Sequence, residues 1–253
     1  MNDVTEKATL RFDQLTREDG ETAQEWVYRA LRFAVMAGQV WPGLALTIRG
    51  VATLLGVSPM PVREALRRLT SEGALELKSN RRIEVPTMTP ARLAELLELR
   101  IVLETHAAVR ALPYVDEARL AELKRLDHEQ DLAFEHYDAE AIILGNLRFH
   151  RMLYTAHPHP VTMPMIERVW LQMGPLHRLA LAHLERTYVV DRHVEIMQAI
   201  EERNPFGLKF ALEADIREGA GYVTQTELLE QYARGEAPLN LPQQDFIRTL
   251  GRH

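Results

Sequence analysis

Apolar residues recur at helical spacing in the N-terminal part of the chain. The clearest stripe has the 3, 4, 7 spacing of one helix face, and its members are Val62, Ala65, Leu66 and Leu69. This stripe predicts a helix that begins near Pro59, with the Ser58 hydroxyl capping its first turn. Shorter patterns predict one helix from Thr22 to Gly38 and another from Thr47 to Gly56. The helix that ends at Gly56 and the one that begins at Pro59 are joined by a short turn, as in a helix-turn-helix.

After Gly73 the apolar pattern changes from helical to alternating. The alternating apolar positions are Leu75, Leu77, Ile83 and Val85. The polar stretch KSNRR lies between the two runs, so we expect a β-hairpin with a basic tip. A hairpin that follows a helix-turn-helix forms the wing of a winged helix.

From Thr89 and Pro90 onward, the apolar patterns are all helical. The predicted helices run from Pro90 to about Leu112, from Asp116 to His136, from Asp138 to Ala156, from Val161 to His183, from Val190 to Glu202 and from Asn204 to about Arg234. Six such helices predict an antiparallel bundle. The expected fold is therefore mainly α, with an N-terminal winged helix-turn-helix followed by a C-terminal all-α antiparallel helical bundle.

Charge divides the chain at the same place as the change in pattern. Residues 22–86 carry nine basic and five acidic side chains, whereas residues 87–253 carry 18 basic and 25 acidic ones. A basic segment in a chain of net charge −6 indicates a polyanionic partner for that segment alone. We expect a flexible arm over 1–21, a DNA-binding domain over 22–86, a helical effector-binding and dimerisation domain over 87–235, and a tail over 236–253.

The basic residues of the first domain lie where a helix-turn-helix contacts DNA. The second helix of this motif enters the major groove, and a wing reaches phosphate or the adjacent minor groove. The candidate DNA-contacting residues from this pattern are Ser58, Met60, Arg63, Arg67, Arg81 and Arg82. The alternative for any one of these arginines is an ordinary solvated surface. For Arg63 the cap, the preceding helix and the basic hairpin agree in favouring DNA.

Two features of the composition limit the possible chemistry and location. The chain has no cysteine, so it has no thiolate nucleophile, and any metal must be bound by histidine and carboxylate. Its apolar runs are far shorter than the roughly 20 residues that span a bilayer, and the polar N-terminus is unlike a signal peptide. We therefore expect a cytoplasmic protein that does not contact the membrane.

Several motifs resemble a known family over roughly residues 22–225. The segments PVREALRRL and EGAL are similar to the winged helix of GntR-type bacterial transcription regulators. The segments LRIVLE, NLRFH, DRHVEIMQAI and ALEADI, in this order, are similar to the FCD-type effector-binding domain of the FadR subfamily. The resemblance implies a regulator that binds operator DNA and a small-molecule effector.

The resemblance also assigns roles to individual residues of the winged helix. It implies that Arg49 and Arg63 contact operator DNA. A third family arginine directly follows the capping residue, and this position is Pro59 here, which removes one base contact. Many relatives have glycine in the wing at the position of Arg82, so we expect stronger phosphate contact and a looser turn.

FCD-type domains often bind a divalent metal through one aspartate and three histidines. The matching positions are Asn146, His150, His193 and Asp215. Two of the four ligands differ, but the carboxylate lost at 146 reappears at 215. Asn146 and His150 lie on one helix face because they are four residues apart, and the set could bind zinc, nickel or manganese. The alternative is that the histidines are buried and hydrogen-bonded to their neighbours.

Arg100, in the LRIVLE motif, allows two interpretations. Its guanidinium group could bind the carboxylate of an effector in a bidentate manner. It could equally pair with Glu104, one helical turn later.

We hypothesise a ligand-responsive regulator that binds a palindromic double-stranded operator as a homodimer. Of the two modes of regulation, we expect repression rather than activation. The effector would be a small organic acid bound by Arg100 and the metal. One alternative is a metal-dependent helical hydrolase with a DNA-binding-like head, but the sequence has no HExxH, no phosphate loop and no nucleophile motif. Another is a constitutive repressor whose pocket binds nothing.

Overall fold

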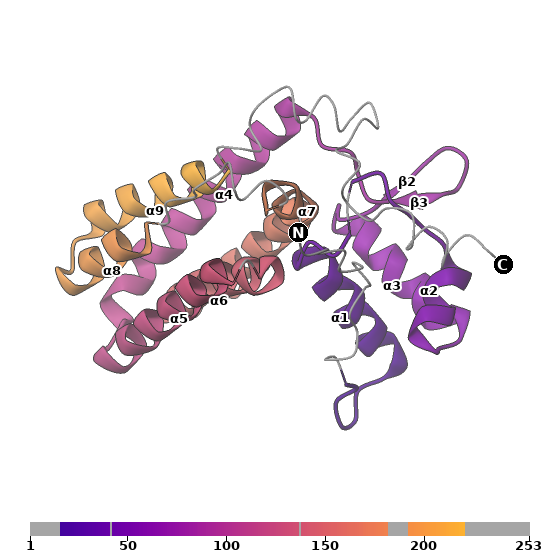
Figure 1. Ribbon diagram of the computed structural model, residues 1–253, viewed down its shortest axis with the longest axis horizontal. Coiled ribbons are helices and arrows are strands. Elements are labelled where there is room, and N and C mark those ends of the chain that lie inside the picture. Colours follow the sequence, from indigo (N-terminus) through magenta and orange to yellow (C-terminus); the bar gives the residue numbers. More distant parts are fainter. Residues whose placement is uncertain (1–15, 41, 137, 182–191, 221–253) are drawn as a thin grey trace, which may run out of the picture.

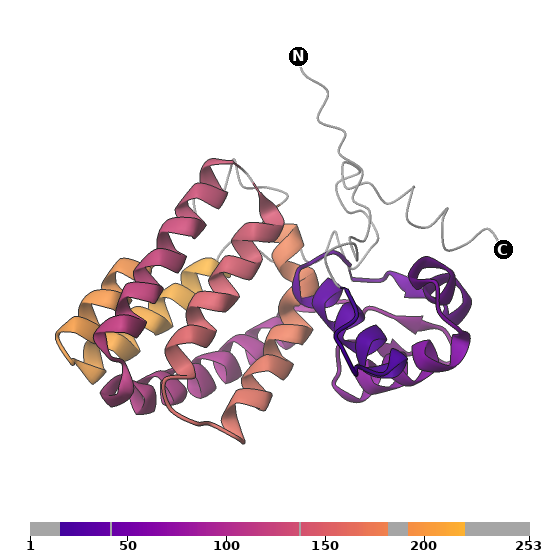
Figure 2. The same ribbon diagram turned by 90° about the horizontal axis from the view of Figure 1, so that it is seen from below.

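The computed structural model describes residues 16–220 except 41, 137 and 182–191. It has two lobes, a small winged helix and a larger helical bundle, with α7 (Thr162–Leu181) at their junction (Figure 1). The lobes lie side by side when the molecule is turned (Figure 2). The predicted fold class is confirmed.

The winged helix contains three helices and a small sheet. Its helices are α1 (Ala23–Met36), α2 (Ile48–Leu55) and α3 (Pro59–Ser71). Its strands are β1 (Ala45–Leu46), β2 (Glu76–Leu77) and β3 (Ile83–Glu84), in the antiparallel order β1-β3-β2. The predicted wing is the β2–β3 hairpin, in which Leu77 pairs with Ile83. We did not predict strand β1, which is only two residues long.

The bundle is a ring of helices around an apolar core. It consists of α4 (Pro90–Ala111), the short 3-10 helix η1 (Leu112–Tyr114), α5 (Glu117–Glu135), α6 (Ala139–Tyr154), α7, α8 (His193–Glu201) and α9 (Pro205–Gly219). Around the ring, α7 contacts α4, α4 contacts α9, α9 contacts α8, α8 contacts α5, α5 contacts α6, and α6 contacts α7. Six long helices are therefore present among the described residues, as the sequence predicts.

Side-chain caps define the start of most helices, and they follow one rule. In each of six helices the cap side chain accepts a hydrogen bond from the backbone N–H three residues later, the caps being Thr22, Thr47, Thr89, Asp116, Asp138 and Asn204. Ser58 has the extended backbone of a cap, but its hydroxyl makes no such bond. The predicted Ser58 hydroxyl cap is therefore wrong, because the residue three positions later is Pro61, which has no N–H.

Several predicted boundaries differ from the structure. Helix α8 begins at His193, whereas Val190 lies outside the described residues. Helix α9 ends at Gly219, and residues 221–234, which we expected to be helical, lie outside the described part. Residues 1–15 of the expected arm and the expected tail 236–253 also lie outside it. Residues 16–21 lie against α1, where Arg29 donates to Thr16 O and Glu21.

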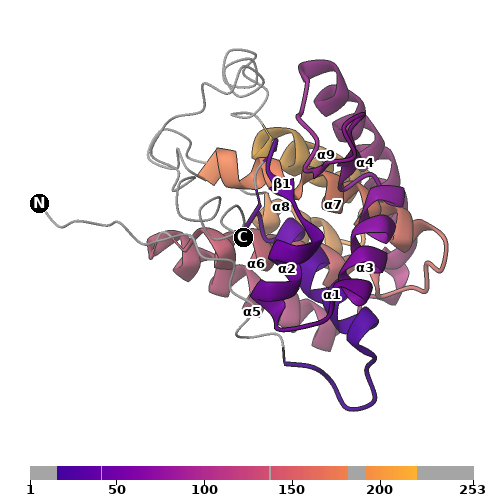
Figure 3. The ribbon, with the colours of Figure 1, turned by 90° about the vertical axis from the view of Figure 1, so that its right-hand side faces the viewer.

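Helix α1 connects the two lobes. It packs against α3 on one side and α7 on the other, and Figure 3 shows α1 to α3 in front of the bundle. At the α1–α7 contact, a Cβ atom built on Gly174 would lie 2.2 Å from Val35 O. Glycine is therefore required for this close approach. Helix α7 continues as a helix through the neighbouring Pro175.

Candidate DNA-binding surface and metal centre

Helix α3 buries one face and exposes the cationic one. Its buried residues are Val62, Ala65, Leu66 and Leu69, the stripe expected from the sequence. The predicted DNA-contacting residues of this helix and its cap, Ser58, Met60, Arg63 and Arg67, are all exposed, and so is Arg49 on α2. Met60 is 63% exposed, unusual for a large apolar side chain. This exposed face is available to contact a partner.

The guanidinium groups of Arg49, Arg63 and Arg67 make no hydrogen bond or ion pair with any other described residue. Arg68 on the same helix behaves differently, because it lies over the Tyr28 ring at 3.7 Å and pairs with Glu72. Internal contacts therefore hold Arg68 within the fold, while the predicted DNA-contacting arginines remain available for an external anion.

The wing presents further cations at its tip. Arg81 is exposed and adopts a left-handed backbone conformation, with φ 63°. Arg82 is exposed too, and its only described ion pair is with Glu84 at 3.6 Å. Such an exposed pair contributes about 1 kcal/mol or less, so it competes weakly with a phosphate. We expected the cost of losing a wing glycine to fall at Arg82. The residue that adopts the left-handed conformation favoured by glycine is instead its neighbour Arg81.

The bundle interior holds a compact group of potential metal ligands. His150 on α6, His193 on α8 and Asp215 on α9 are buried, and one ligand atom of each lies within 4.8 Å of the others. The structure thus brings together three of the four predicted ligands. Asn146 lies one turn before His150 on α6 and is half-buried; its role as a ligand stays a prediction.

Hydrogen bonds fix the tautomer of His150. The Tyr154 hydroxyl donates to Glu104 Oε2 at 2.7 Å and lies 3.0 Å from His150 Nδ1. Since its only proton goes to Glu104, the hydroxyl oxygen accepts from His150 Nδ1–H. Burial, together with the charge of Glu104, raises the pKa of Tyr154 well above its usual value, so the hydroxyl remains a donor.

This tautomer leaves a lone pair on His150 Nε2. That atom lies 3.1 Å from Asp215 Oδ2, yet the two atoms do not form a hydrogen bond. A neutral imidazole nitrogen and a carboxylate oxygen at this distance repel unless a cation lies between them or the imidazole is protonated. Burial alone would raise the pKa of Asp215, but protonated imidazoles at His150 and His193, together with the Arg192 N–H, outweigh burial and lower this pKa.

His193 is oriented in the same manner. Its Nδ1 lies 3.0 Å from Asp127 Oδ1 on α5, and its ring stacks on Phe149 at 3.7 Å. A carboxylate that accepts from Nδ1 turns Nε2 toward the cluster, as in many metal sites where a second residue orients the histidine. Two oriented histidines and one carboxylate fit the donor set that zinc and related divalent metals prefer.

Arg100 is buried and forms the ion pair with Glu104 that the sequence offered as one of two interpretations. Its Nε donates to Glu104 Oε1 at 2.6 Å, and Trp170 Nε1 donates to the same oxygen at 2.8 Å. Glu104 therefore joins Arg100, Tyr154 and Trp170 in one buried network beside the cluster. A role of Arg100 in effector binding stays a prediction.

Sequence reasoning missed three residues of this site and named a fourth, Glu104, only as a partner of Arg100. Each comes from a different helix of the ring: Glu104 from α4, Asp127 from α5, Tyr154 from α6 and Trp170 from α7. Of the three missed residues, only Tyr154 has a local signal, because it lies four residues after His150 and so shares its helix face.

The fold is that of a winged-helix regulator whose second domain is a helical bundle. The sequence matches the gntR family of bacterial regulatory proteins over residues 23–85 and the FCD domain over residues 95–218. The HTH-type transcriptional regulator McbR of Escherichia coli K12 is 33% identical over 185 residues, which are 72% of this chain and 84% of McbR. The chain belongs to the gntR family and carries an FCD domain.

Two further comparisons agree with this membership. The gluconate operon transcriptional repressor of Bacillus subtilis 168 is 24% identical over 184 residues, or 69% of this chain and 74% of the repressor. The solved structure of E. coli McbR/YncC superposes with a TM-score of 0.75 at 29% identity, covering 82% of this chain and 99% of that chain. These relatives are DNA-binding transcription regulators and not enzymes, so the hydrolase alternative is not favoured.

Within the described residues, no helix is both long and apolar enough to cross a membrane.

Proposed function

We propose that this chain represses transcription by binding a palindromic operator as a homodimer in the cytoplasm, and that a small organic acid controls the binding. The observation that carries the proposal is the unengaged cationic face of α2, α3 and the wing. Arg49, Arg63 and Arg67 are exposed, and their guanidinium groups make no hydrogen bond or ion pair with other described residues, although the chain as a whole is acidic. A relative is named as a repressor, which favours repression over activation.

A homodimer is supported by an exposed apolar surface on the bundle. Phe206 and Phe210 on α9 are 85% and 78% exposed, and Leu99 and Val102 on the adjoining α4 are exposed as well. Apolar surface of this kind marks an interaction site on a globular protein. Two copies of one winged helix also match the two halves of a palindrome, because two-fold symmetry in the protein matches two-fold symmetry in the DNA.

The effector pocket is proposed at the cluster of His150, His193 and Asp215. These residues would hold a divalent metal, with Asn146 as a possible fourth ligand. When bound, the metal would supply a positive charge that attracts the carboxylate of an organic acid. Arg100 would add a second positive charge, since Glu104 occupies only part of its guanidinium group.

Helix α7 offers a route from this pocket to the reading helix. Trp170 donates to Glu104 beside the pocket. Two residues earlier, Arg168 donates to the carbonyl oxygens of Ser71 and Glu72 at the end of α3, at 2.5 and 3.0 Å. A shift of α7 on effector binding would therefore move the end of the reading helix. The effector must bind one arrangement better than the other to change operator affinity.

Arginine variants test the DNA contacts. Arg63→Ala should weaken binding to a selected operator duplex by about 1 to 3 kcal/mol and relax specificity at one base position. Arg82→Ala should weaken selected and scrambled duplexes alike and reduce the salt dependence, because it contacts phosphate. Arg217→Ala, an exposed arginine of α9, is the control and should change neither. Equal losses on both duplexes for Arg63→Ala and Arg82→Ala would defeat this assignment.

Metal analysis tests the pocket. Purified protein reconstituted with zinc, nickel or manganese should retain metal, and His150→Ala should lose it. A ligand-induced rise in melting temperature with carboxylates then separates a working sensor from a constitutive repressor. Absence of metal after reconstitution would leave a pocket that depends on Arg100 alone.

A further inference from the structure

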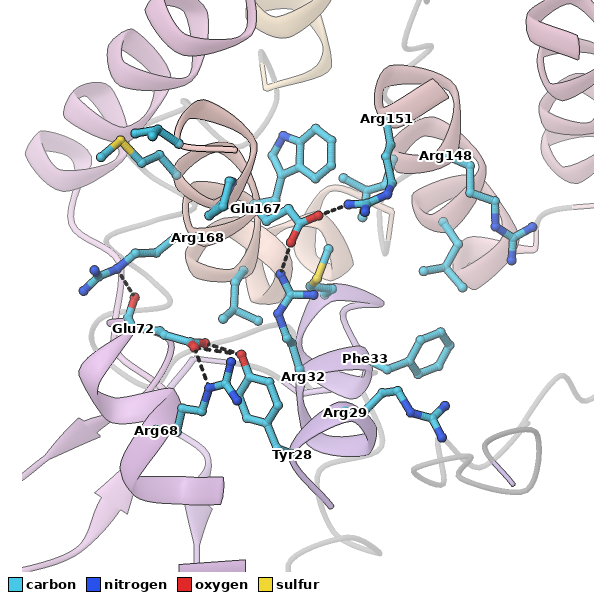
Figure 4. Close-up of a pocket in the computed structure, with 18 of the residues that line it drawn as sticks. Tyr28, Arg29, Arg32, Phe33, Arg68, Glu72, Arg148, Arg151, Glu167 and Arg168 are labelled. Carbon is cyan, nitrogen blue, oxygen red and sulfur yellow. Dashed lines mark hydrogen bonds and ion pairs between the residues drawn. The ribbon is translucent and has the colours of Figure 1, made fainter. Parts of the chain in front are cut away.

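A wide cleft lies between the two lobes, apart from the buried cluster. Its volume is about 1110 Å³, which is large enough for a metabolite. Helices α1 and α3 of the winged helix form one side, and α6 and α7 of the bundle form the other (Figure 4). Any ligand that fills this cleft contacts both lobes.

The cleft is strongly cationic. Its lining includes six arginines, which are Arg29, Arg32, Arg68, Arg148, Arg151 and Arg168. It includes only two carboxylates, Glu72 and Glu167. This excess of positive charge occurs in a chain whose net charge is −6, so the arginines are concentrated here against the overall balance.

Internal ion pairs neutralise only part of this charge. Arg32 and Arg151 share the single carboxylate of Glu167. Arg168 donates only to backbone carbonyl oxygens. Arg148 on α6 is exposed, and its guanidinium group makes no hydrogen bond or ion pair within the described part of the chain. At least three positive charges of the cleft therefore lack a matching carboxylate.

Apolar side chains complete the lining. Phe33 and Met36 come from α1, Leu144 and Leu147 from α6, and Met165 from α7. Figure 4 shows Phe33 beside Arg29 and Arg32 on α1, across from Arg148 and Arg151 on α6. Arginines next to apolar side chains suit a ligand that joins anionic groups to an apolar part.

We infer that this interlobe cleft binds a small polyanion with phosphate or carboxylate groups, held by Arg148 and Arg151 from the bundle and by Arg32 from the winged helix. Duplex DNA is the less favoured occupant. On helix α3, Arg68 lies about 140° around the axis from Arg63, so the cleft opens away from the proposed DNA-reading face.

The inference goes beyond the proposed function, because it adds a second ligand site that requires neither the metal nor Arg100. A polyanion that bridges α1 and α6 would stabilise one orientation of the winged helix relative to the bundle. Trp170 lines the cleft and also donates to Glu104, so the two sites share one side chain.

Calorimetric titration of the full chain with pyrophosphate and with citrate, at constant ionic strength, tests the site. Saturable binding of one ligand per chain is expected for at least one probe, and the probe that binds identifies phosphate or carboxylate as the recognised group. Arg148→Gln should weaken this binding about tenfold, the effect of one lost charge-assisted hydrogen bond. This variant removes no hydrogen bond or ion pair among the described residues, so its melting temperature should equal that of the wild type.

Matched variants distinguish binding in the cleft from binding elsewhere on the chain. Arg217→Gln removes an exposed arginine on α9 and should leave binding unchanged, as should His150→Ala, which disables the metal cluster. The inference is overturned if neither probe saturates, if Arg148→Gln binds like the wild type, or if Arg217→Gln loses as much affinity. Loss of binding in His150→Ala would place the probe on the metal, and an equal loss of duplex DNA affinity in Arg148→Gln would place DNA in the cleft. Each of these two results would also overturn it.

Discussion

Substitution of Gly174 by alanine tests how the two lobes are joined. The added Cβ would lie 2.2 Å from Val35 O, 2.9 Å from Val35 C and 3.0 Å from the Met36 Cα. All three atoms belong to the backbone of α1, which cannot rotate away as a side chain can. Helix α7 must therefore shift by an ångström or more to restore a normal contact, and this shift disturbs the packing of the winged helix on the bundle.

The size of the effect follows from two opposing contributions. Overpacking in a well-packed contact costs about 1 to 3 kcal/mol, and more where backbone must move. Alanine in place of glycine inside a helix stabilises it by about 1 kcal/mol. Because only backbone atoms can yield here, the upper part of the range applies, about 2 to 3 kcal/mol. Subtracting the gain of about 1 kcal/mol, we expect Gly174→Ala to lower the free energy of unfolding by about 1 to 2 kcal/mol. For a chain of this size, that corresponds to a fall of roughly 2 to 8 °C in melting temperature.

Urea denaturation with a matched control checks this expectation. Gly145 is also inside a helix, but its added Cβ would meet only the Gln130 side chain, at 3.5 Å from Oε1 and 3.7 Å from Cβ, which are ordinary contacts. Gly145→Ala should therefore be neutral or stabilising by up to about 1 kcal/mol. If Gly174→Ala proved as stable as Gly145→Ala, the close contact between α1 and α7 would not exist in solution.

Three further predictions concern buried and half-buried groups. Glu104→Ala leaves buried Arg100 without a carboxylate and should cost about 3 to 5 kcal/mol in urea denaturation; a cost as small as that of the exposed Glu98→Ala would contradict the buried network. Asp127→Asn should weaken metal affinity about 10- to 100-fold in a chelator competition, whereas an unchanged affinity would show that Asp127 does not orient His193. Burial and the charge of Arg100 lower the pKa of His177 to about 3. The unfolded chain therefore binds this proton first, and stability should fall as the pH drops from about 6.5 toward 3, by at most about 1.4 kcal/mol per pH unit. His177→Gln should flatten this dependence, and parallel curves for wild type and variant would show that the native fold does not lower the pKa of His177.

Local features of the structure could be predicted from the sequence. Thr47, Thr89 and Asp116 cap helices where expected, because a cap depends on a few consecutive residues. The error at Ser58 is also local: the hydroxyl is present, but Pro61 removes its partner. The short strand β1 left no pattern that a period of two could reveal.

The site was predictable only in part, since its contacts join distant parts of the chain. His150, His193 and Asp215 were grouped by resemblance to a family, and the structure places them together. The residues that orient them gave no such signal. Tyr154 reaches Glu104 across 50 positions and His193 reaches Asp127 across 66, separations that no helical or alternating period encodes.

The cleft between the lobes shows the same limitation. Its arginines appear in the sequence as ordinary charges on the faces of helices. Only the packing of α1 against α7 brings those of the winged helix next to those of the bundle. The local excess of positive charge is therefore a property of the tertiary structure alone.

Selection of binding sites from random duplex DNA by the full-length protein tests the DNA-reading role most directly. The exposed arginines Arg49, Arg63, Arg67, Arg81 and Arg82 predict enrichment of an inverted repeat bound by two chains, with affinity that falls steeply as salt rises. If no sequence is enriched, and if the protein binds no duplex even at low ionic strength, then this cationic face does not read DNA.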